Sequence, residues 1–239
     1  MNKWKEIWDK KSVEKSKFEG KDKKAIHLEL IKCLGDASKG VMYEEYYKQY
    51  EEIRYNLCNS PGKGELPIKS VYEIGCGSGA KLFLFENEAN LYVGGADYSS
   101  GLIESAKYAL KSKDLIVEEA VKVPVEPIFD AVFSSSVFQY FDSDEYAEAV
   151  LEIMLKKARF SLGIIDIQDK DKMEESLAYR RSVIKNYDEK YKDLGRAFYS
   201  KDFFENFAKK HDLEIVFGGY NMKGYRNGDY SYACYMYKK

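Results

Sequence analysis

The spacing of hydrophobic residues changes at residues 59–69, a segment that holds two of the four prolines and two glycines. Before this segment, hydrophobic side chains recur every three or four positions, which is the period of one helical face. The positions fall into three stripes: Trp4, Ile7 and Trp8; His27, Leu30, Ile31 and Leu34; Met42, Tyr46, Tyr50, Ile53 and Leu57. The pattern predicts an N-terminal helical cap at residues 1–58, joined by a loop to the rest of the chain.

After the loop, short apolar runs alternate with amphipathic stretches, as in a parallel sheet covered by helices. Strands are predicted at Ser70–Ile74, Leu91–Ala96, Leu115–Glu118, Ala131–Ser135 and Phe160–Ile167. Helices are predicted at Ala80–Asn87, Gly101–Lys111, Asp144–Lys157 and Lys201–Lys210. Two last runs, Leu213–Tyr220 and Tyr230–Tyr237, flank Asn227-Gly228, a hairpin signal. We therefore expect an α/β, doubly wound, Rossmann-like domain at residues 70–239, with a seven-stranded, mostly parallel sheet that ends in an antiparallel hairpin.

The segment at residues 169–200 is longer than a usual connection between a strand and a helix. Insertions at the carboxyl ends of such strands often cover a binding site, so we expect a lid-like element here. The alternative is that this segment forms a helical insertion on the surface that covers no site.

Composition and charge narrow the function classes. The 239 residues include 45% hydrophobic residues, enough for one ordinary domain, and their formal net charge is -2. A surface that binds nucleic acid normally needs an excess of basic over acidic residues, so we expect no nucleic-acid partner. No apolar run is long enough to span a membrane, the N-terminus has no hydrophobic leader, and the four cysteines form no CxxC pair. These features predict a cytoplasmic protein without a membrane partner, a zinc site or a disulfide framework.

The strongest chemical signal is a glycine-rich turn at residues 71–79, with the sequence VYEIGCGSG. A strand runs directly into three alternate glycines and then into a helix, so the backbone can turn tightly and bring free amides to a ligand. The spacing is GxGxG rather than the GxGxxG of dinucleotide-binding proteins. Glu73 at the strand end favours a cationic or hydrogen-donating ligand and would repel a pyrophosphate. A nicotinamide-dependent oxidoreductase is therefore the less favoured alternative.

These residues resemble the first motif of the class I S-adenosylmethionine-dependent methyltransferases, E/D-x-G-x-G-x-G. Three further segments resemble later motifs of that family in the expected order, namely residues 94–99, 118–120 and 129–137. The resemblance implies that Asp97 binds the ribose hydroxyls, that Glu119 and Ala120 meet the adenine, and that the methyl donor lies beside the strand ending at Ser135. It implies S-adenosylmethionine as cofactor, S-adenosylhomocysteine as product and no metal. The implied cofactor-binding residues are Glu73, Gly75, Cys76, Gly77, Asp97, Tyr98, Glu119, Ala120 and Ser135.

One further cofactor contact is predicted without a motif. Arg54, on the last helix before the glycine turn, is a candidate partner for the carboxylate of the methionyl group. A solvated helix charge is the alternative for this residue.

The acceptor side is less defined. Gln139 and Tyr140 fall where the family places substrate-facing side chains, and Tyr140 is expected to orient an acceptor near the methyl group. His27 could reach the substrate from an N-terminal helix, with a core position as the alternative. Arg180 with Tyr199 could bind an anionic acceptor such as a carboxylate or phosphate.

The fourth predicted strand lacks the residues that two classes of acceptor would require at its end. The residues after it are serines, not the D/N-P-P-Y/F motif of nucleic-acid base methylation, and they offer no acid for metal-assisted chemistry. The resemblance thus implies an enzyme that methylates a small polar metabolite or biosynthetic intermediate, with O-methylation preferred. An N-methyltransferase and a non-catalytic cofactor-binding protein are the alternatives, and the acceptor and oligomeric state stay open.

Overall fold

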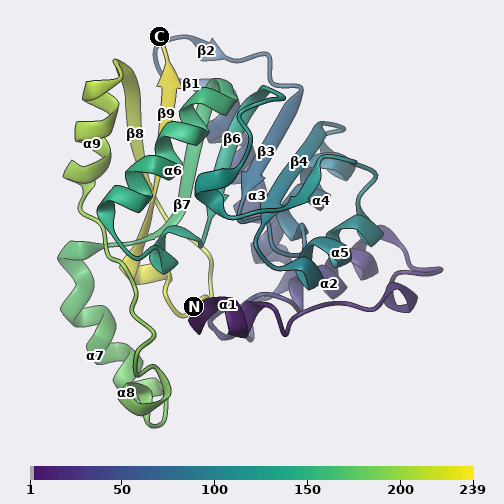
Figure 1. Cartoon of the computed structure of the whole chain (residues 1–239), viewed down its shortest axis with the longest axis vertical. Coiled ribbons are helices and arrows are strands. Elements are labelled where there is room, and N and C mark those ends of the chain that lie inside the picture. Colours follow the sequence, from purple (N-terminus) through teal and green to yellow (C-terminus); the bar gives the residue numbers. More distant parts are fainter. Residues whose placement is uncertain (1–2) are drawn as a thin grey trace.

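The computed structural model describes residues 3–239 and contains one large sheet of seven strands in the order β5-β4-β3-β6-β7-β9-β8 (Figure 1). The strands are β3 (Ser70–Ile74), β4 (Tyr92–Asp97), β5 (Leu115–Val117), β6 (Phe129–Ser135), β7 (Ala158–Gln168), β8 (Leu213–Gly219) and β9 (Ser231–Lys238). Strands β3 to β7 pair in parallel, whereas β9 is antiparallel to both of its neighbours. The predicted Rossmann-like fold class is confirmed.

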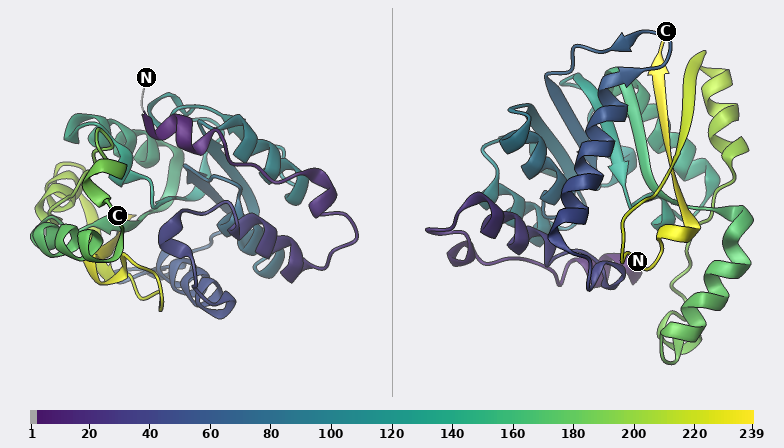
Figure 2. Two further views of the ribbon diagram at one scale, coloured as in Figure 1. Left: turned by 90° about the horizontal axis from the view of Figure 1, so that it is seen from below. Right: turned by 180° about the vertical axis from the view of Figure 1, so that it is seen from behind.

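Helices cover both faces of this sheet (Figure 2). Helices α3 (Tyr43–Cys58), α4 (Ala80–Glu88) and α5 (Ser100–Ala109) pack on one face, and α6 (Asp144–Lys157) and α9 (Lys201–Lys210) pack on the other. Helix α6 begins as its sequence predicts, because the Ser143 hydroxyl accepts a hydrogen bond from the Tyr146 amide, which has no partner within the helix.

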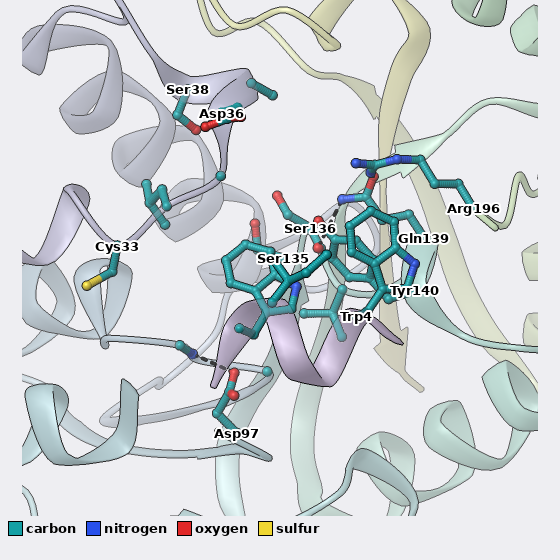
Figure 3. A pocket seen from close by; sticks show the side chains of 18 of the residues that line it. Trp4, Cys33, Asp36, Ser38, Asp97, Ser135, Ser136, Gln139, Tyr140 and Arg196 are labelled. Carbon is teal, nitrogen blue, oxygen red and sulfur yellow. Dashed lines mark hydrogen bonds between the residues drawn. The ribbon is translucent and has the colours of Figure 1, made fainter. Parts of the chain in front are cut away.

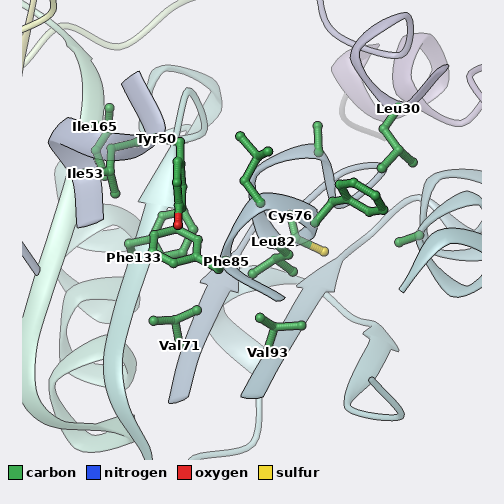
Figure 4. Packing of buried hydrophobic residues seen from close by; sticks show 14 of the residues in the cluster. Leu30, Tyr50, Ile53, Val71, Cys76, Leu82, Phe85, Val93, Phe133 and Ile165 are labelled. Atoms are coloured by element: carbon green, nitrogen blue, oxygen red, sulfur yellow. The ribbon is translucent and has the colours of Figure 1, made fainter. Parts of the chain in front are cut away.

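The apolar stripe of α3 is buried against the sheet. Tyr50 and Ile53 on α3 pack with Phe85 of α4, Phe133 of β6 and Ile165 of β7 in one hydrophobic cluster (Figure 4). The sequence break at residues 59–69 therefore does not separate two bodies, because α3 belongs to the layer that covers the sheet. The break itself contains two very short paired strands, β1 (Asn59–Ser60) and β2 (Gly64–Glu65).

The rest of the predicted cap is divided between two places. Helix α2 (Lys23–Ile31) packs on α4 and α5, whereas α1 (Lys3–Trp8) lies across the carboxyl ends of the parallel strands (Figure 1). Residues 1 and 2 of the predicted cap lie outside the described residues.

The C-terminal strands pair as predicted, but the turn between them differs. Residues 220–230 form a long connection in which Asn227 has a φ of -95° and Gly228 begins a short 3₁₀ turn. A two-residue type I′ turn needs positive φ at both central residues, so Asn227-Gly228 is not such a turn. The reversed strand β9 lies inside the sheet, between β7 and β8, and not at its edge.

The insertion at residues 169–200 contains α7 (Met173–Val183) and α8 (Tyr187–Lys190) and projects beyond the carboxyl ends of the parallel strands (Figure 1). Its two ends are held together by a bridge between Asp169 and Tyr199. Among residues 3–239, no helix has the length and apolar character needed to cross a membrane.

Candidate active site

A cavity of about 490 Å³ opens at the carboxyl ends of β3, β4 and β6. This is the usual position of a ligand in an open parallel sheet, where connections leave the strands in opposite directions. Its wall also includes α1, the loop at residues 33–38, the insertion and the β8–β9 connection. Segments from both ends of the chain thus complete a site whose floor is the sheet.

The glycine turn after β3 forms one wall of the cavity. Gly75, Gly77 and Gly79 have φ values of 76°, 53° and 76°, which residues with a Cβ rarely adopt. A Cβ on Gly75 would also lie 2.3 Å from a methyl carbon of Val137. The sharp turn brings the backbone to the cavity and starts α4 there, while the Gly75 and Cys76 amides donate to the Ala96 carbonyl and the Gly77 amide donates to Asp97.

Asp97 joins the glycine turn to the end of β4. One carboxylate oxygen accepts a hydrogen bond from the Gly77 amide at 2.9 Å (Figure 3). The other accepts one from the Ser99 amide at 2.9 Å. Burial raises the pKa of Asp97, and these two amides oppose that rise. A carboxylate oxygen can accept more than one hydrogen bond, so Asp97 can also receive hydroxyl groups from a ligand.

Glu73, at the end of β3, is 3% exposed and lines the same cavity. One of its carboxylate oxygens, Oε2, has no hydrogen-bond partner within the described structure, and the buried hydroxyl of Ser135 has none either. Burial raises the pKa of Glu73 to about 8, with Lys81 opposing the rise and Asp97 adding to it. An unpaired buried carboxylate is costly, so this position fits a ligand that brings a cationic or hydrogen-donating group.

The opposite end of the cavity is aromatic and basic. The rings of Trp4 and Tyr140 lie with centroids 4.7 Å apart, and Trp8 contacts Tyr140 at 5.8 Å. The guanidinium of Arg196 lies 4.9 Å from the Trp4 ring centroid and donates a hydrogen bond to Gln139 Oε1 (Figure 3). Burial raises the pKa of Tyr140 and Arg196 opposes the rise, so the phenol stays protonated near neutral pH and can orient an acceptor by hydrogen bonding.

Most of the predicted site residues line this one cavity. They are Glu73, Gly75, Cys76, Gly77, Asp97, Tyr98, Glu119, Ala120, Ser135, Gln139, Tyr140 and Arg180. Glu119 is half exposed and pairs with Lys122 at 2.9 Å. The cavity therefore brings together all the predicted cofactor residues except Arg54.

Three predicted residues lie outside the cavity wall. His27 is 2% exposed, stacks on Phe83 and has its pKa lowered to about 4 by burial, so it is a neutral core residue. Arg54 is exposed because the opposite side of α3 packs on the sheet. Tyr199 is buried in the core beside α9, where its hydroxyl donates to the Phe138 carbonyl at 3.0 Å. Their positions correct the roles predicted for these residues at the site.

Several lining residues have no signal in the sequence. Trp4 and Trp8 resemble an ordinary helical stripe, and Arg196 and Tyr225 lie in connections without a motif. The Tyr225 hydroxyl donates to Asp166 at 2.7 Å, which orients the ring at the cavity wall. Within residues 3–239, no group of three or more His, Cys, Asp or Glu side chains could hold a metal ion.

Comparison with known proteins is consistent with this geometry. Residues 72–157 match the family model described as a methyltransferase domain. No curated protein matches the chain in sequence.

Solved structures share the fold at low sequence identity. Magnesium protoporphyrin IX methyltransferase from Synechocystis PCC 6803 with bound SAH has a TM-score of 0.59 and 13% identity, over 86% of this chain and 88% of that one. The plantazolicin methyltransferase BpumL in complex with SAH has a TM-score of 0.59 and 19% identity, over 99% and 97%. CalS10, an amino pentose methyltransferase from Micromonospora echinaspora, has a TM-score of 0.58 and 11% identity, over 85% and 94%.

Proposed function

We propose that this chain, a class I S-adenosylmethionine-dependent methyltransferase, transfers a methyl group to a small polar metabolite or biosynthetic intermediate and prefers an oxygen acceptor. The observation that carries the proposal is one cavity with an acidic, glycine-lined end and an aromatic, basic end. N-methylation of a small amine and cofactor binding without turnover are the alternatives.

The acidic end fits the cofactor. When bound, S-adenosylmethionine supplies a methyl group on a positively charged sulfonium. The unpaired carboxylate oxygen of Glu73 is available for its amino group, and Asp97 is available for its ribose hydroxyls. Glu119 and Ala120, on the same wall, are available for the adenine. The positive φ values of Gly75 and Gly77 bring the backbone of the turn to the cavity wall, where the cofactor can lie close to it.

The chemistry at the other end needs little acid–base assistance. Neither of the two histidines lines the described cavity, and the phenol of Tyr140 is protonated near neutral pH. A nucleophile that is already ionised, such as a carboxylate or phenolate oxygen, needs no strong base, and positioning and desolvation then supply most of the acceleration. The arginines at this end disfavour a protonated amine, which supports oxygen over nitrogen and an acceptor with negative charge.

Other parts of the proposal rest on composition. The formal net charge of -2 supports a small molecule rather than nucleic acid as acceptor. All four cysteines are free thiols, which fits the reducing cytoplasm. The structural relatives act, by their titles, on a porphyrin, on plantazolicin analogues and on an amino pentose, so the fold leaves the acceptor open.

Calorimetric titration with S-adenosylhomocysteine, with NAD as the matched comparison, tests the cofactor class. We expect binding of the first and none of the second. Asp97→Ala should raise the dissociation constant by at least about tenfold, or about 1.4 kcal/mol, because the glycine turn loses its anchor and the ribose its acceptor. Asp188→Ala, which removes an exposed carboxylate on the insertion, should leave the affinity unchanged. Unchanged affinity in Asp97→Ala would contradict the assignment.

Turnover separates the enzyme from the non-catalytic alternative. The purified chain is incubated with methyl-labelled S-adenosylmethionine and a metabolite extract, and labelled products are resolved by chromatography and mass spectrometry. Label in an ester or ether supports O-methylation, and label on an amine supports the alternative acceptor. Binding of the cofactor without any labelled product would support a non-catalytic protein.

A further inference from the structure

Two arginines reach the aromatic end of the cavity from the insertion. Arg180 on α7 is 3% exposed and donates a hydrogen bond to the side-chain oxygen of Gln168, at the end of β7. Its Nε has no hydrogen-bond partner in the described structure. Arg196 contacts Gln139, as described above, and its guanidinium also lies 5.4 Å from the ring centroid of Tyr140. Both side chains line the cavity.

These two guanidinium groups are held by neutral amides and have no acidic partner among residues 3–239. Neither forms an ion pair there, whereas Arg181, the next residue on α7, is exposed and pairs with Asp188 at 3.0 Å. The buried carboxylate of Asp166 accepts a hydrogen bond from the amide of Gln168, and Gln168 separates it from Arg180. Burial and then the charge of Arg196 lower the pKa of Arg180, whereas burial of Arg196 is outweighed by the facing hydroxyls of Tyr140 and Tyr225, which raise its pKa.

Arg180 is buried and Arg196 is half-buried, and neither forms an ion pair among the described residues. Removing a charge from water costs several kcal/mol unless an opposite charge or several hydrogen bonds compensate. Guanidinium groups present parallel N–H donors that match the oxygens of a carboxylate or phosphate. An oxyanion between these arginines would therefore supply the missing partner, including one for Arg180 Nε.

The surroundings of the arginines are flat and apolar. Trp4, Trp8 and Tyr140 form one contiguous group of rings, and Tyr191 of the insertion lies 6.4 Å from Trp4. Arg196 lies against this group, so an anion bound to its outer N–H groups would carry its remaining atoms along the rings (Figure 3). Planar apolar molecules pack well on such surfaces.

We propose that Arg180 and Arg196 form an oxyanion subsite, and that the acceptor is a flat, apolar molecule that carries a carboxylate or a phosphate. The methylation of this molecule rests on the proposed function, but its recognition by the two arginines does not. The charges then complement one another along the cavity. Glu73 and Asp97 lie at the end for the cationic cofactor, and the arginines lie at the end for the anionic acceptor.

The test uses the full chain and the two tryptophans that the sequence contains, Trp4 and Trp8, both of which line the cavity. Tryptophan fluorescence is followed as benzoate, phenyl phosphate or the uncharged benzamide is added, with saturating S-adenosylhomocysteine present. At least one of the two anions should bind about tenfold or more tightly than benzamide. The stronger of the two anions identifies whether the subsite prefers a carboxylate or a phosphate.

Variants assign the preference to the two arginines. Arg180→Gln and Arg196→Gln should each abolish the advantage of the anion, and Arg180→Lys should retain part of it because a point charge remains. Arg181→Gln, one position along the same helix, should behave as the wild type. S-adenosylhomocysteine affinity and the thermal midpoint are measured for every variant, so that loss of the subsite is distinguished from loss of the fold.

Three results would overturn the inference. They are equal binding of benzoate, phenyl phosphate and benzamide; no binding of any of them; and an anion preference that survives both glutamine variants in folded protein. The proposed function fails separately, if the wild-type chain does not bind S-adenosylhomocysteine. An anion preference that is measured without S-adenosylhomocysteine and depends on the arginines would in that case still support the oxyanion subsite.

Discussion

Glu73 should make the stability of the cofactor-free protein depend on pH in an unusual direction. Burial raises the pKa of this carboxyl to about 8 in the folded chain, from a usual value of 4.5. Between these values the folded chain holds a proton that the unfolded chain releases. The contribution of Glu73 to stability is therefore present below the lower value and is lost as the pH rises through the higher one.

The magnitude follows from the same two pKa values. In the middle of this window, each pH unit removes about 1.4 kcal/mol of unfolding free energy. From about pH 6 to about pH 8 the loss through Glu73 is about 2 kcal/mol, because the side chain begins to ionise near the upper limit. Glu73→Gln cannot ionise, so this variant should lack that part of the pH dependence.

Urea denaturation of the cofactor-free chain, followed by tryptophan fluorescence at both pH values, measures this difference. Titrating groups that do not interact with Glu73 contribute equally to wild type and variant, so the comparison reports Glu73 together with its coupling to Asp97. Glu51→Gln, which changes an exposed glutamate on α3, should follow the wild type. Identical pH dependence in wild type and Glu73→Gln would refute the reasoning, since it would mean that Glu73 is ionised or hydrated in the folded protein.

Two further predictions concern the backbone and the core. Gly75→Ala should destabilise the fold by at least about 1–3 kcal/mol, because it combines a positive φ with a 2.3 Å contact to Val137. Gly20→Ala, at a φ of 70° with no atom within 4 Å, should destabilise the fold less in the same thermal unfolding assay. Equal destabilisation by the two variants would contradict the argument. Lys157→Met should lower the unfolding free energy by about 1–3 kcal/mol in urea titrations, because the buried ammonium donates to the carbonyls of Pro124, Val125 and Pro127. Lys156→Met, on the same helix, is the control. An unchanged unfolding free energy in Lys157→Met would show that water can replace the ammonium at these carbonyls.

The sheet and the acidic, glycine-lined end of the cavity could be predicted because local patterns determine them. A buried strand that runs into Gly75, Gly77 and Gly79 requires positive φ values at fixed positions, and the carboxyl end of each parallel strand must reach the same edge of the sheet. Glu73 and Asp97 therefore had to lie near one another. These are consequences of spacing along a few short segments.

The aromatic, basic end of the cavity could not be predicted in the same way. Arg196 reaches the cavity because the insertion folds back on α1, and no periodicity in residues 169–200 indicates that path. His27 and Trp4 are two examples of this difficulty. Both lie on apolar helical stripes of similar appearance, yet His27 packs in the core and Trp4 lines the cavity. Which stripe faces a ligand depends on how distant elements pack, and a single stripe does not contain that information.

The indole N–H of Trp4 donates to the carbonyl of Gly195 at 2.9 Å, a contact that spans 191 positions of the sequence. Because α1 precedes Gly195 by about 190 positions, it is synthesised well before the carbonyl that holds it. Contacts at such separation form slowly, since the intervening chain must first be brought together. The aromatic, basic end of the cavity is therefore expected to be among the last parts of the protein to assemble, after the sheet that supports it.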